Sequence, residues 1–126
     1  MSKVWFITGA GSGIGTGIAK AALRAGDRVV ATGRNINKVR NALGDLASEN
    51  LAFVQLDVVD EAQASAAIEK AVQRFGRIDV AVNNAGYSLL GNFEEMTISE
   101  LQSQLATNFY GVAYVMRAVL PAMRKQ

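Results

Sequence analysis

The sequence predicts an α/β fold in which a parallel sheet of four strands, in the order 3-2-1-4, carries helices on both faces. Two observations lead to this prediction. Short apolar runs alternate with longer segments of helical periodicity along all 126 residues, and this alternation is typical of right-handed βαβ units. In addition, four glycines within seven residues, from Gly9 to Gly15, join the first apolar run to the first helical segment.

The strands are expected at the apolar runs and the helices between them. The four expected strands are Lys3–Thr8, Arg28–Thr32, Leu51–Leu56 and Ile78–Asn83. The four expected helices are Gly13–Arg24, Ile36–Ala47, Glu61–Phe75 and Ile98–Arg124. Residues 29–31 and 80–82 are small and apolar throughout, as in strands that are covered on both faces. The chain shows no repeat, linker or domain boundary, so residues 1–126 are expected to form one domain.

The helix expected to begin at Ile98 has a clear start, because Thr97 and Glu100 have the spacing of a capping box. Apolar residues then recur at steps of three and four and form one stripe. The stripe consists of Leu101, Leu105, Phe109, Val112, Met116 and Val119. Two interpretations stay open: the helix packs on the sheet, or a partner or further chain buries a second side of it.

Composition excludes several kinds of site. The chain has no cysteine and no histidine, so disulfides, thiolate or imidazole metal ligands and a Ser-His-Asp triad are excluded, and no metal site is expected. The net charge is +2 without a dense basic stripe, which gives no case for nucleic acid. No apolar run approaches the ~20 residues that span a bilayer, and a signal-peptide pattern is lacking. The cytoplasm is the expected location.

The glycine turn is the first candidate site. Glycines let the backbone turn tightly and approach a pyrophosphate, whose charge is then met by a helix N-terminus. The spacing is not the G-x-G-x-x-G fingerprint, and no Gly-Lys-Ser/Thr follows, which excludes a P-loop. A simple tight turn is the alternative, but four glycines between a strand and a helix favour a dinucleotide cradle in a Rossmann-type fold.

The end of the second strand indicates which dinucleotide would bind. An Asp or Glu at this place would bind the ribose 2′-hydroxyl of NAD. Gly33 stands there instead, and Arg34 follows. A guanidinium can pair with a 2′-phosphate through charge-assisted hydrogen bonds. NADP is therefore favoured over NAD, with an ordinary loop charge as the alternative role for Arg34.

Polar residues also end the third and fourth strands. Asp57 could accept a hydrogen bond from the adenine amino group, or it could serve a turn or a helix cap, although Asp60 competes for the cap before Glu61. Residues 83–86, Asn-Asn-Ala-Gly, end the fourth strand. Small residues there let a cofactor approach the backbone, and a plain loop is the alternative.

Together these motifs resemble the classical short-chain dehydrogenases/reductases. The matching pieces, in that family's order and spacing, are residues 8–15, 57–58 and 83–86, and Asn108 within residues 107–111. The resemblance implies an NAD(P)-dependent oxidoreductase acting between alcohols and carbonyls, and Arg34 matches the position at which NADP-preferring members carry a basic residue. With that preference, the expected reaction is hydride transfer between NADP(H) and a small-molecule carbonyl or alcohol substrate.

The resemblance also implies roles for individual residues. It places the pyrophosphate on the glycine turn, at Gly9, Gly11, Ser12, Gly13, Ile14 and Gly15. It implies adenine contacts from Asp57 and Val58, and contacts near the adenosine ribose and the nicotinamide from Asn84, Ala85 and Gly86. Asn108 corresponds to the helix asparagine of the catalytic tetrad, where it helps to hold a water in a proton relay.

The chain departs from this family in the rest of the catalytic machinery. The family uses a Ser and a Tyr-x-x-x-Lys pair downstream of the last helix. None of Tyr87, Tyr110 and Tyr114 is followed by Lys at the required step, and Tyr110 and Tyr114 are predicted to be helix packing residues. We therefore expect the N-terminal half of the family's fold, truncated before the C-terminal strands, and we expect the 126-residue chain alone to be inactive.

A non-catalytic nucleotide-binding or assembly module is the alternative function. The fourth strand is expected to be a sheet edge with unpaired backbone groups, which favours association. The apolar stripe of the last helix points in the same direction, so a homo-oligomer is expected. Turnover would distinguish the two functions, whereas cofactor binding is compatible with both.

Overall fold

The computed structural model of the chain describes residues 2–126. Four strands form one parallel sheet in the order β3-β2-β1-β4, which confirms the predicted fold and strand order. The strands are β1 (Val4–Ile7), β2 (Arg28–Gly33), β3 (Leu51–Gln55) and β4 (Val80–Val82). The strand order reverses at β1, and in such sheets a crevice opens at the carboxyl ends of the strands.

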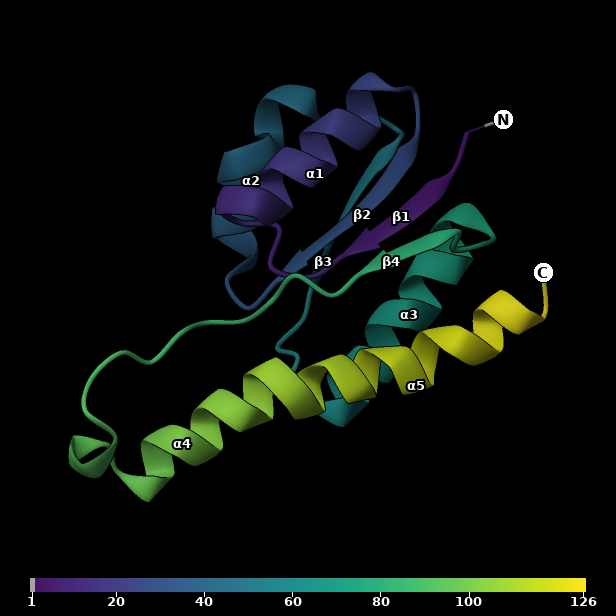
Figure 1. The fold of residues 1–126 in the computed structure, drawn as a ribbon. Coiled ribbons are helices and arrows are strands. Elements are labelled where there is room, and N and C mark those ends of the chain that lie inside the picture. The colour runs from purple at the N-terminus through teal and green to yellow at the C-terminus, as the bar shows by residue number, and fades with distance from the viewer. Residues whose placement is uncertain (1) are drawn as a thin grey trace.

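Helices cover both faces of the sheet, as predicted (Figure 1). The helices α1 (Gly13–Arg24) and α2 (Ile36–Leu43) lie on one face. The helices α3 (Glu61–Phe75) and α5 (Gly111–Arg124) lie on the other face. A helix α4 (Ile98–Leu105) precedes α5, and the two are joined by a π-helical segment, η3 (Ala106–Tyr110). Short 3₁₀ turns, η1 (Gly44–Leu46) and η2 (Phe93–Glu95), complete the described part.

Some predicted boundaries were wrong. The strand β4 is only three residues long, because Asp79 is held to β1 through its side chain and backbone in place of regular strand pairing. The helix α2 ends at Leu43 and continues as the 3₁₀ turn η1, where Gly44 interrupts the predicted helix. The predicted single helix from Ile98 to Arg124 contains the π-helical segment. The helices α1 and α3 have the predicted boundaries.

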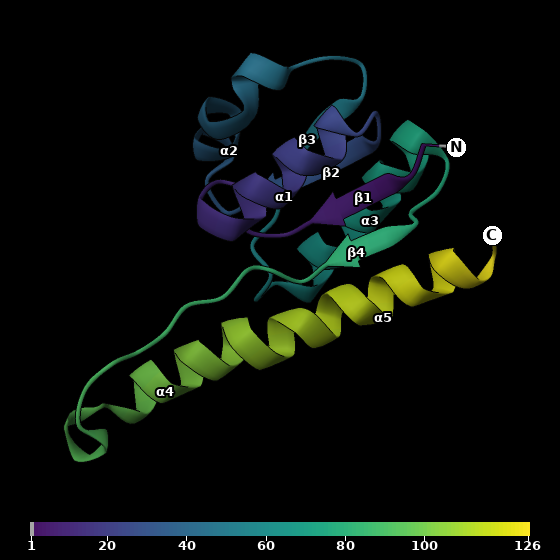
Figure 2. The ribbon, with the colours of Figure 1, turned by 45° about the horizontal axis from the view of Figure 1, so that its top comes forward.

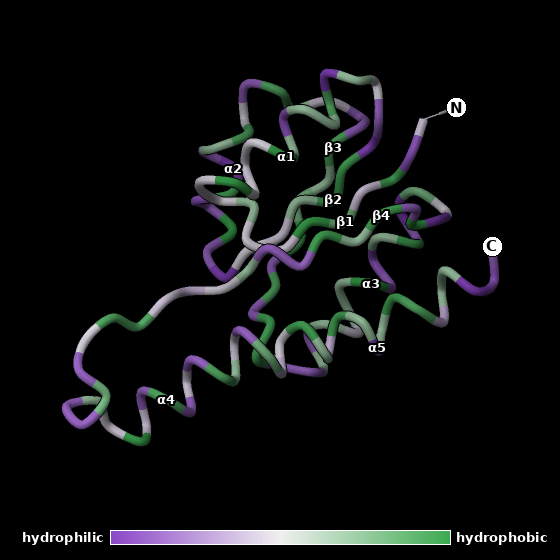
Figure 3. Tube along the Cα trace, in the orientation of Figure 1, coloured by the Kyte–Doolittle hydropathy of each residue, from purple (hydrophilic) through white to green (hydrophobic). Residues whose placement is uncertain are grey.

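Two apolar clusters, one on each face of the sheet, form the core. Residues 29–31 of β2 are fully buried, as predicted for a strand covered on both faces. Hydrophobic residues follow β1 and β2 through the centre of the molecule (Figure 3). Residues 80–82 of β4 are only half-buried, which corrects the prediction of full cover. The reason is that β4 is an edge strand with one neighbour.

The apolar stripe of the last helix divides into two parts. Val115 and Val119 are buried in the cluster formed with α3 and the sheet, which confirms packing for the C-terminal part. Leu105 and Phe109 are 57% and 61% exposed. Figures 1 and 2 both show α4 reaching away from the sheet. The helix therefore packs on the body at one end and presents an apolar face to solvent at the other.

Side-chain caps fix the starts of α2, α3 and α4. The Asp60 carboxylate accepts the Gln63 N–H at the start of α3, so Asp60 takes the cap for which Asp57 was the alternative. Thr97 and Glu100 form the predicted capping box at the start of α4. Among residues 2–126, no helix combines the length and hydropathy needed to cross a bilayer.

Two aspartates tie the N-terminal part of β1 to its neighbours. The Asp27 carboxylate accepts hydrogen bonds from the Lys3 backbone N–H and the Trp5 indole, each at 2.9 Å, and both hold the pKa of Asp27 below its ordinary value of 3.8. The Asp79 carboxylate pairs with Arg77 and accepts the Val4 N–H at 2.8 Å. The Arg77 hydrogen bond lowers the pKa of Asp79, and the Val4 N–H adds to this against the opposing effect of desolvation.

Candidate functional site

A cleft of about 430 Å³ opens at the carboxyl ends of the strands. It collects the glycine turn, the end of β2, the residues after β3 and the residues after β4. The predicted residues that line it are Gly9, Ser12, Gly13, Ile14, Arg34, Asp57, Val58, Asn84, Ala85 and Gly86. The structure thus brings together residues from four separate chain segments that the sequence indicated one by one.

The glycine turn has the geometry of a cradle. Gly9 and Gly13 adopt φ values of +62° and +57°, in the left-handed region that favours glycine. Gly15 does not line the cleft, and its role is packing: a Cβ there would lie 2.3 Å from the Gly9 carbonyl oxygen. The turn can therefore fold back on the first turn of α1 only because position 15 has no side chain.

The start of α1 is open to an anion. Its N-cap residue, Ser12, makes no side-chain cap hydrogen bond, and its first turn contains no acidic residue. The first N–H groups of any α-helix lack intrahelical partners, and the helix dipole adds positive potential there. Ile14 is 76% exposed in this turn, so the backbone lies open at the cleft. This arrangement fits a pyrophosphate.

Thr8 organises the site, although it was not among the predicted site residues. It is 1% exposed. Its hydroxyl accepts the backbone N–H groups of Asn84 and Ala85, each at 3.0 Å, and donates to the Val82 carbonyl at 3.3 Å. The hydroxyl thus joins the carboxyl ends of β1 and β4. The available signal was a polar residue between a buried strand and the glycine turn.

The Asn84 side chain holds the same junction from the other side. Its amide nitrogen donates to the carbonyl oxygens of Thr8 and Gly9, at 3.3 and 3.1 Å. Asn84 lines the cleft but directs its amide at the glycine turn. The structure therefore gives Asn84 a supporting role in the cradle, while its contact with the adenosine part of a cofactor stays a prediction.

A second concavity of about 330 Å³ adjoins the cleft at the end of β2. Arg34 and Lys38 both line it, together with Gly11, Ser12 and Asn35. None of the residues that the structure places around it is acidic. Lys38 was not among the predicted site residues, because an exposed lysine on an amphipathic helix is ordinary in sequence. Two cations beside one small hollow make it suited to an anion such as a phosphate monoester.

Asp57 and Val58 lie where β3 ends, at the opposite wall of the cleft. One carboxylate oxygen of Asp57 accepts the Val59 N–H at 3.3 Å, and the Asp57 N–H donates to the Gln63 side chain at 2.9 Å. Asp57 therefore forms the turn that was its alternative role, and it also lines the cleft. Gly111 at the start of α5 approaches Val58 closely, since a Cβ there would lie 2.7 Å from Val58 Cγ2.

Asn108 lies within the π-helical segment, and its side chain binds the backbone of Tyr87. Its Oδ1 accepts the Tyr87 N–H at 3.0 Å, and its Nδ2 donates to the Tyr87 carbonyl at 2.7 Å. Gly86 has no Cβ, and one there would lie 2.9 Å from Asn108 Oδ1. Asn108 thus fixes the segment after β4, while Tyr87 and Thr107 line the cleft. A π-turn of this kind is frequent at functional sites.

The two helix tyrosines differ in their packing. Tyr114 packs against the buried cluster, as predicted. Tyr110 is 52% exposed, and its ring centroid lies 5.2 Å from that of Phe109 and 6.4 Å from that of Tyr114. The prediction of a packed Tyr110 was therefore wrong, because α5 reaches the body only beyond this point.

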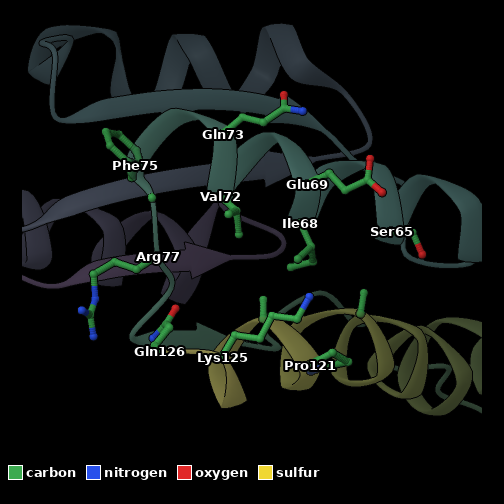
Figure 4. Close-up of a pocket in the computed structure, with 13 residues that line it drawn as sticks. Ser65, Ile68, Glu69, Val72, Gln73, Phe75, Arg77, Pro121, Lys125 and Gln126 are labelled. Atoms are coloured by element: carbon green, nitrogen blue, oxygen red, sulfur yellow. The ribbon is translucent and has the colours of Figure 1, made fainter.

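A larger groove, of about 800 Å³, lies between α3 and α5 (Figure 4). Ile68 and Val72 point from α3 toward α5, and Pro121 and Lys125 form part of the other side. None of the predicted site residues lines this groove. At its end, the Gln126 side chain accepts the Ile78 N–H and donates to the Ile78 carbonyl, at 2.8 and 3.0 Å. The groove is thus separate from the cleft.

Comparison with known proteins places these features in a family. The family model described as short chain dehydrogenase matches residues 3–126. The chain is 42% identical over 126 residues to the oxidoreductase BOA17 of Botryotinia fuckeliana, covering all of this chain and 46% of that protein. It is 36% identical over 124 residues to the uncharacterized oxidoreductase SAR2567 of Staphylococcus aureus, covering 98% of this chain and 54% of that protein. The chain thus spans about half the length of the curated relatives it matches.

Solved structures give the same result. A short-chain dehydrogenase from Streptomyces avermitilis superimposes with a TM-score of 0.92 at 38% identity, over 99% of this chain and 46% of that one. The 3-ketoacyl-(acyl-carrier-protein) reductase from Brucella melitensis, complexed with NADH, gives a TM-score of 0.93 at 34% identity, over 98% of this chain and 51% of that one. The fold described above therefore matches about half of each of these solved structures.

Proposed function

The chain belongs to the short-chain dehydrogenase family, and from that premise we propose that it supplies the cofactor-binding half of an NADP(H)-dependent oxidoreductase. The reaction proposed is hydride transfer between NADP(H) and a small-molecule carbonyl or alcohol substrate. The observation that carries the proposal is the uncapped, glycine-lined start of α1, which opens into the same cleft as Arg34.

Different residues around the cleft bind different parts of the cofactor. The first turn of α1 meets the pyrophosphate with its free N–H groups. Asp57 and Val58 form the adenine wall, and Asn84 and Thr8 keep the glycine turn in position. When bound, NADP(H) supplies the hydride donor or acceptor, and the chain's own residues hold and orient it.

The preference for NADP over NAD rests on charge. Gly33 leaves no carboxylate at the end of β2, and Arg34 and Lys38 border the adjoining concavity. Both cations stabilise a bound phosphate monoester through charge-assisted hydrogen bonds, whereas a neutral ribose hydroxyl gains no such stabilisation. One structural neighbour is a complex with NADH, so the preference belongs to this chain's own residues and is not carried over from that neighbour.

Asn108 is proposed as part of the catalytic machinery, as the family resemblance implies. Its side chain holds both backbone groups of Tyr87 beside the cleft. This pairing orders the segment after β4, and a role in a proton relay is a further part of the proposal. The Ser and Tyr-x-x-x-Lys of the family have no counterpart in these 126 residues. We therefore propose that the chain alone does not turn over substrate.

The test is calorimetric titration of the chain with NADPH and NADH. We expect NADPH to bind more tightly, and we expect Arg34→Ala and Lys38→Met each to weaken NADPH binding by about tenfold, since a charge-assisted hydrogen bond contributes about 1.5–3 kcal/mol. The matched control is Arg40→Met, which removes a cation of the same helix outside the concavity. If the chain binds neither NADPH nor NADH, the proposed function is refuted.

A second candidate, a nucleotide-binding or assembly module, is favoured by one observation: α4 and η3 present Ile98, Leu105 and Phe109 to solvent. A homo-oligomer that buries this face is the corresponding proposal. Turnover of NADPH by the chain with a panel of carbonyl compounds would exclude the non-catalytic module, and it would also overturn the proposal that the chain alone is inactive. A cytoplasmic location stays a prediction of the sequence.

A further inference from the structure

We propose that Val39, a buried residue of α2, determines the dinucleotide preference of this chain by filling the space that any side chain at position 33 would need. The inference rests on the proposed function for its cofactor part. Val39 lies beneath the candidate phosphate site, and its steric conflict with a side chain at position 33 can be measured without any cofactor.

The glycine at position 33 is required by packing. A Cβ built on Gly33 would lie 2.7 Å from Val39 Cγ2, a distance that real Cβ atoms essentially never show. The next neighbour, the Asn35 carbonyl oxygen, is 4.0 Å away. The backbone of Gly33 lies outside the left-handed region, since it is not among the glycines with positive φ. One methyl group of Val39 is therefore the obstacle to a side chain at this position.

Val39 has little freedom to move aside. It is 1% exposed and belongs to the apolar cluster that includes Ile7, Ala31 and Leu43. A β-branched residue in a helix is restricted to one strongly preferred rotamer, and a close-packed core resists local shifts. Its Cγ2 would also lie 3.5 Å from a Cβ at Gly11. Val39 is thus wedged between the end of β2 and the glycine turn.

This packing favours NADP over NAD because it excludes a carboxylate from position 33. A carboxylate at the end of the second strand is the group that binds the ribose 2′-hydroxyl of NAD. Val39 prevents position 33 from carrying one, while Arg34 and Lys38 remain beside the hollow. Only a cofactor with a phosphate at this place then gains charge-assisted hydrogen bonds. A single Gly33→Asp substitution is therefore expected to fail as a switch of preference.

The first arm of the test uses no cofactor. Urea unfolding midpoints are compared for Gly33→Ala, Val39→Ala and the double variant. We expect Gly33→Ala to lower the midpoint with Val39 present, and to leave it unchanged or raise it in the Val39→Ala background. Gly44→Ala is the control, because a Cβ there meets nothing within 4 Å, so its effect should be the same in both backgrounds. Equal effects of Gly33→Ala in both backgrounds would overturn the inference.

The second arm measures binding. Titration with NADPH and NADH is carried out on the parent chain, on Gly33→Asp and on Gly33→Asp combined with Val39→Ala. We expect the double variant to lose at least tenfold in NADPH affinity, to gain at least tenfold in NADH affinity, and to unfold at a higher urea concentration than Gly33→Asp alone. A gain of NADH affinity by Gly33→Asp alone would contradict the proposed exclusion.

The two arms separate this inference from the proposed function. If no variant and no parent chain binds either dinucleotide, the proposed function and the cofactor part of the inference fail, and the unfolding arm still decides the steric part. If the parent binds NADPH and the double variant unfolds at a higher urea concentration than Gly33→Asp without gaining NADH affinity, the steric part holds and Val39 is not the determinant of preference.

Discussion

Thr8 and Asn84 hold each other across the junction of β1 and β4. The Thr8 hydroxyl accepts the Asn84 N–H at 3.0 Å, and the Asn84 side chain donates back to the Thr8 carbonyl at 3.3 Å. The two residues are 76 positions apart in the chain. Their reciprocal bonds join the glycine turn to the segment after β4, and both segments line the cleft.

Replacing Thr8 by Val is expected to destabilise the chain. The variant keeps the shape of the side chain but leaves the N–H groups of Asn84 and Ala85 without their acceptor. Each buried donor left without a partner costs about 1–3 kcal/mol, so for the two donors we expect a loss of about 2–6 kcal/mol in the free energy of unfolding, measured by urea titration. The control Thr8→Ser retains the hydroxyl and should lose much less. Equal losses in the two variants would show that the hydroxyl is not the cause.

Gly15→Ala is expected to damage the cradle. A Cβ at position 15 would lie 2.3 Å from the Gly9 carbonyl oxygen and 2.5 Å from the Asn84 amide nitrogen, so the turn must shift away from α1. We expect a loss of about 3 kcal/mol or more in unfolding free energy, at the upper end of what overpacking costs, together with loss of NADPH binding by titration.

The matched control for this variant is Gly17→Ala, one half-turn further along α1. A Cβ at Gly17 meets nothing within 4 Å, and alanine has the higher helix propensity. We expect this control to gain about 0.5–1 kcal/mol and to bind NADPH as the parent chain does. Similar destabilisation of both variants would mean that the loss does not come from the contact with Gly9.

Most of the fold could be predicted from the sequence, because it follows from local chemistry. The periodicity of α3 and the cap at Asp60 are both fixed within a few residues, and the predicted boundaries of that helix were correct. The π-helical segment was not predictable in this way, because one extra residue in a turn leaves the apolar steps nearly unchanged. The position of Asn108 within that segment depends on the tertiary bonds it makes to Tyr87.

In the candidate site, too, some residues could be predicted from local sequence and others could not. The glycine turn and Arg34 were apparent because their residue types are unusual at the end of a strand. Lys38 and Val39 gave no such signal, since a lysine followed by a valine is ordinary on an amphipathic helix. Their importance arises from where α2 docks, with Lys38 over Gly11 and Val39 against Gly33. Such contacts between segments are a property of the folded chain.

Acid is expected to destabilise the chain through Asp79 and Asp27. Both carboxyls have folded-state pKa values below the ordinary value of 3.8, so the unfolded chain takes up protons first as the pH falls. Their contribution is complete well above pH 3.8 and is lost as the pH falls through the lower folded-state values. We expect urea midpoints to decline more steeply below about pH 4.5 in the parent than in Asp79→Asn. If Asp79→Asn kept the parent's full acid dependence, the prediction would be contradicted. Glu94→Gln, which removes an exposed carboxyl elsewhere, serves as the control.

The exposed apolar face of α4 and η3 is expected to drive self-association of the chain. Leu105 and Phe109 are one helical turn apart and are both more than half exposed, and burying such a side chain contributes about 1.5–3 kcal/mol. We expect a concentration-dependent mass in sedimentation equilibrium. Leu105→Glu with Phe109→Glu should raise the dissociation constant by about a hundredfold or more, since about 1.4 kcal/mol corresponds to a factor of ten. Ser103→Glu, which adds a charge to an exposed polar position on the other side of the same helix, should leave the association unchanged. A monomer mass at all concentrations of the parent chain would show that this face is not an interface between copies.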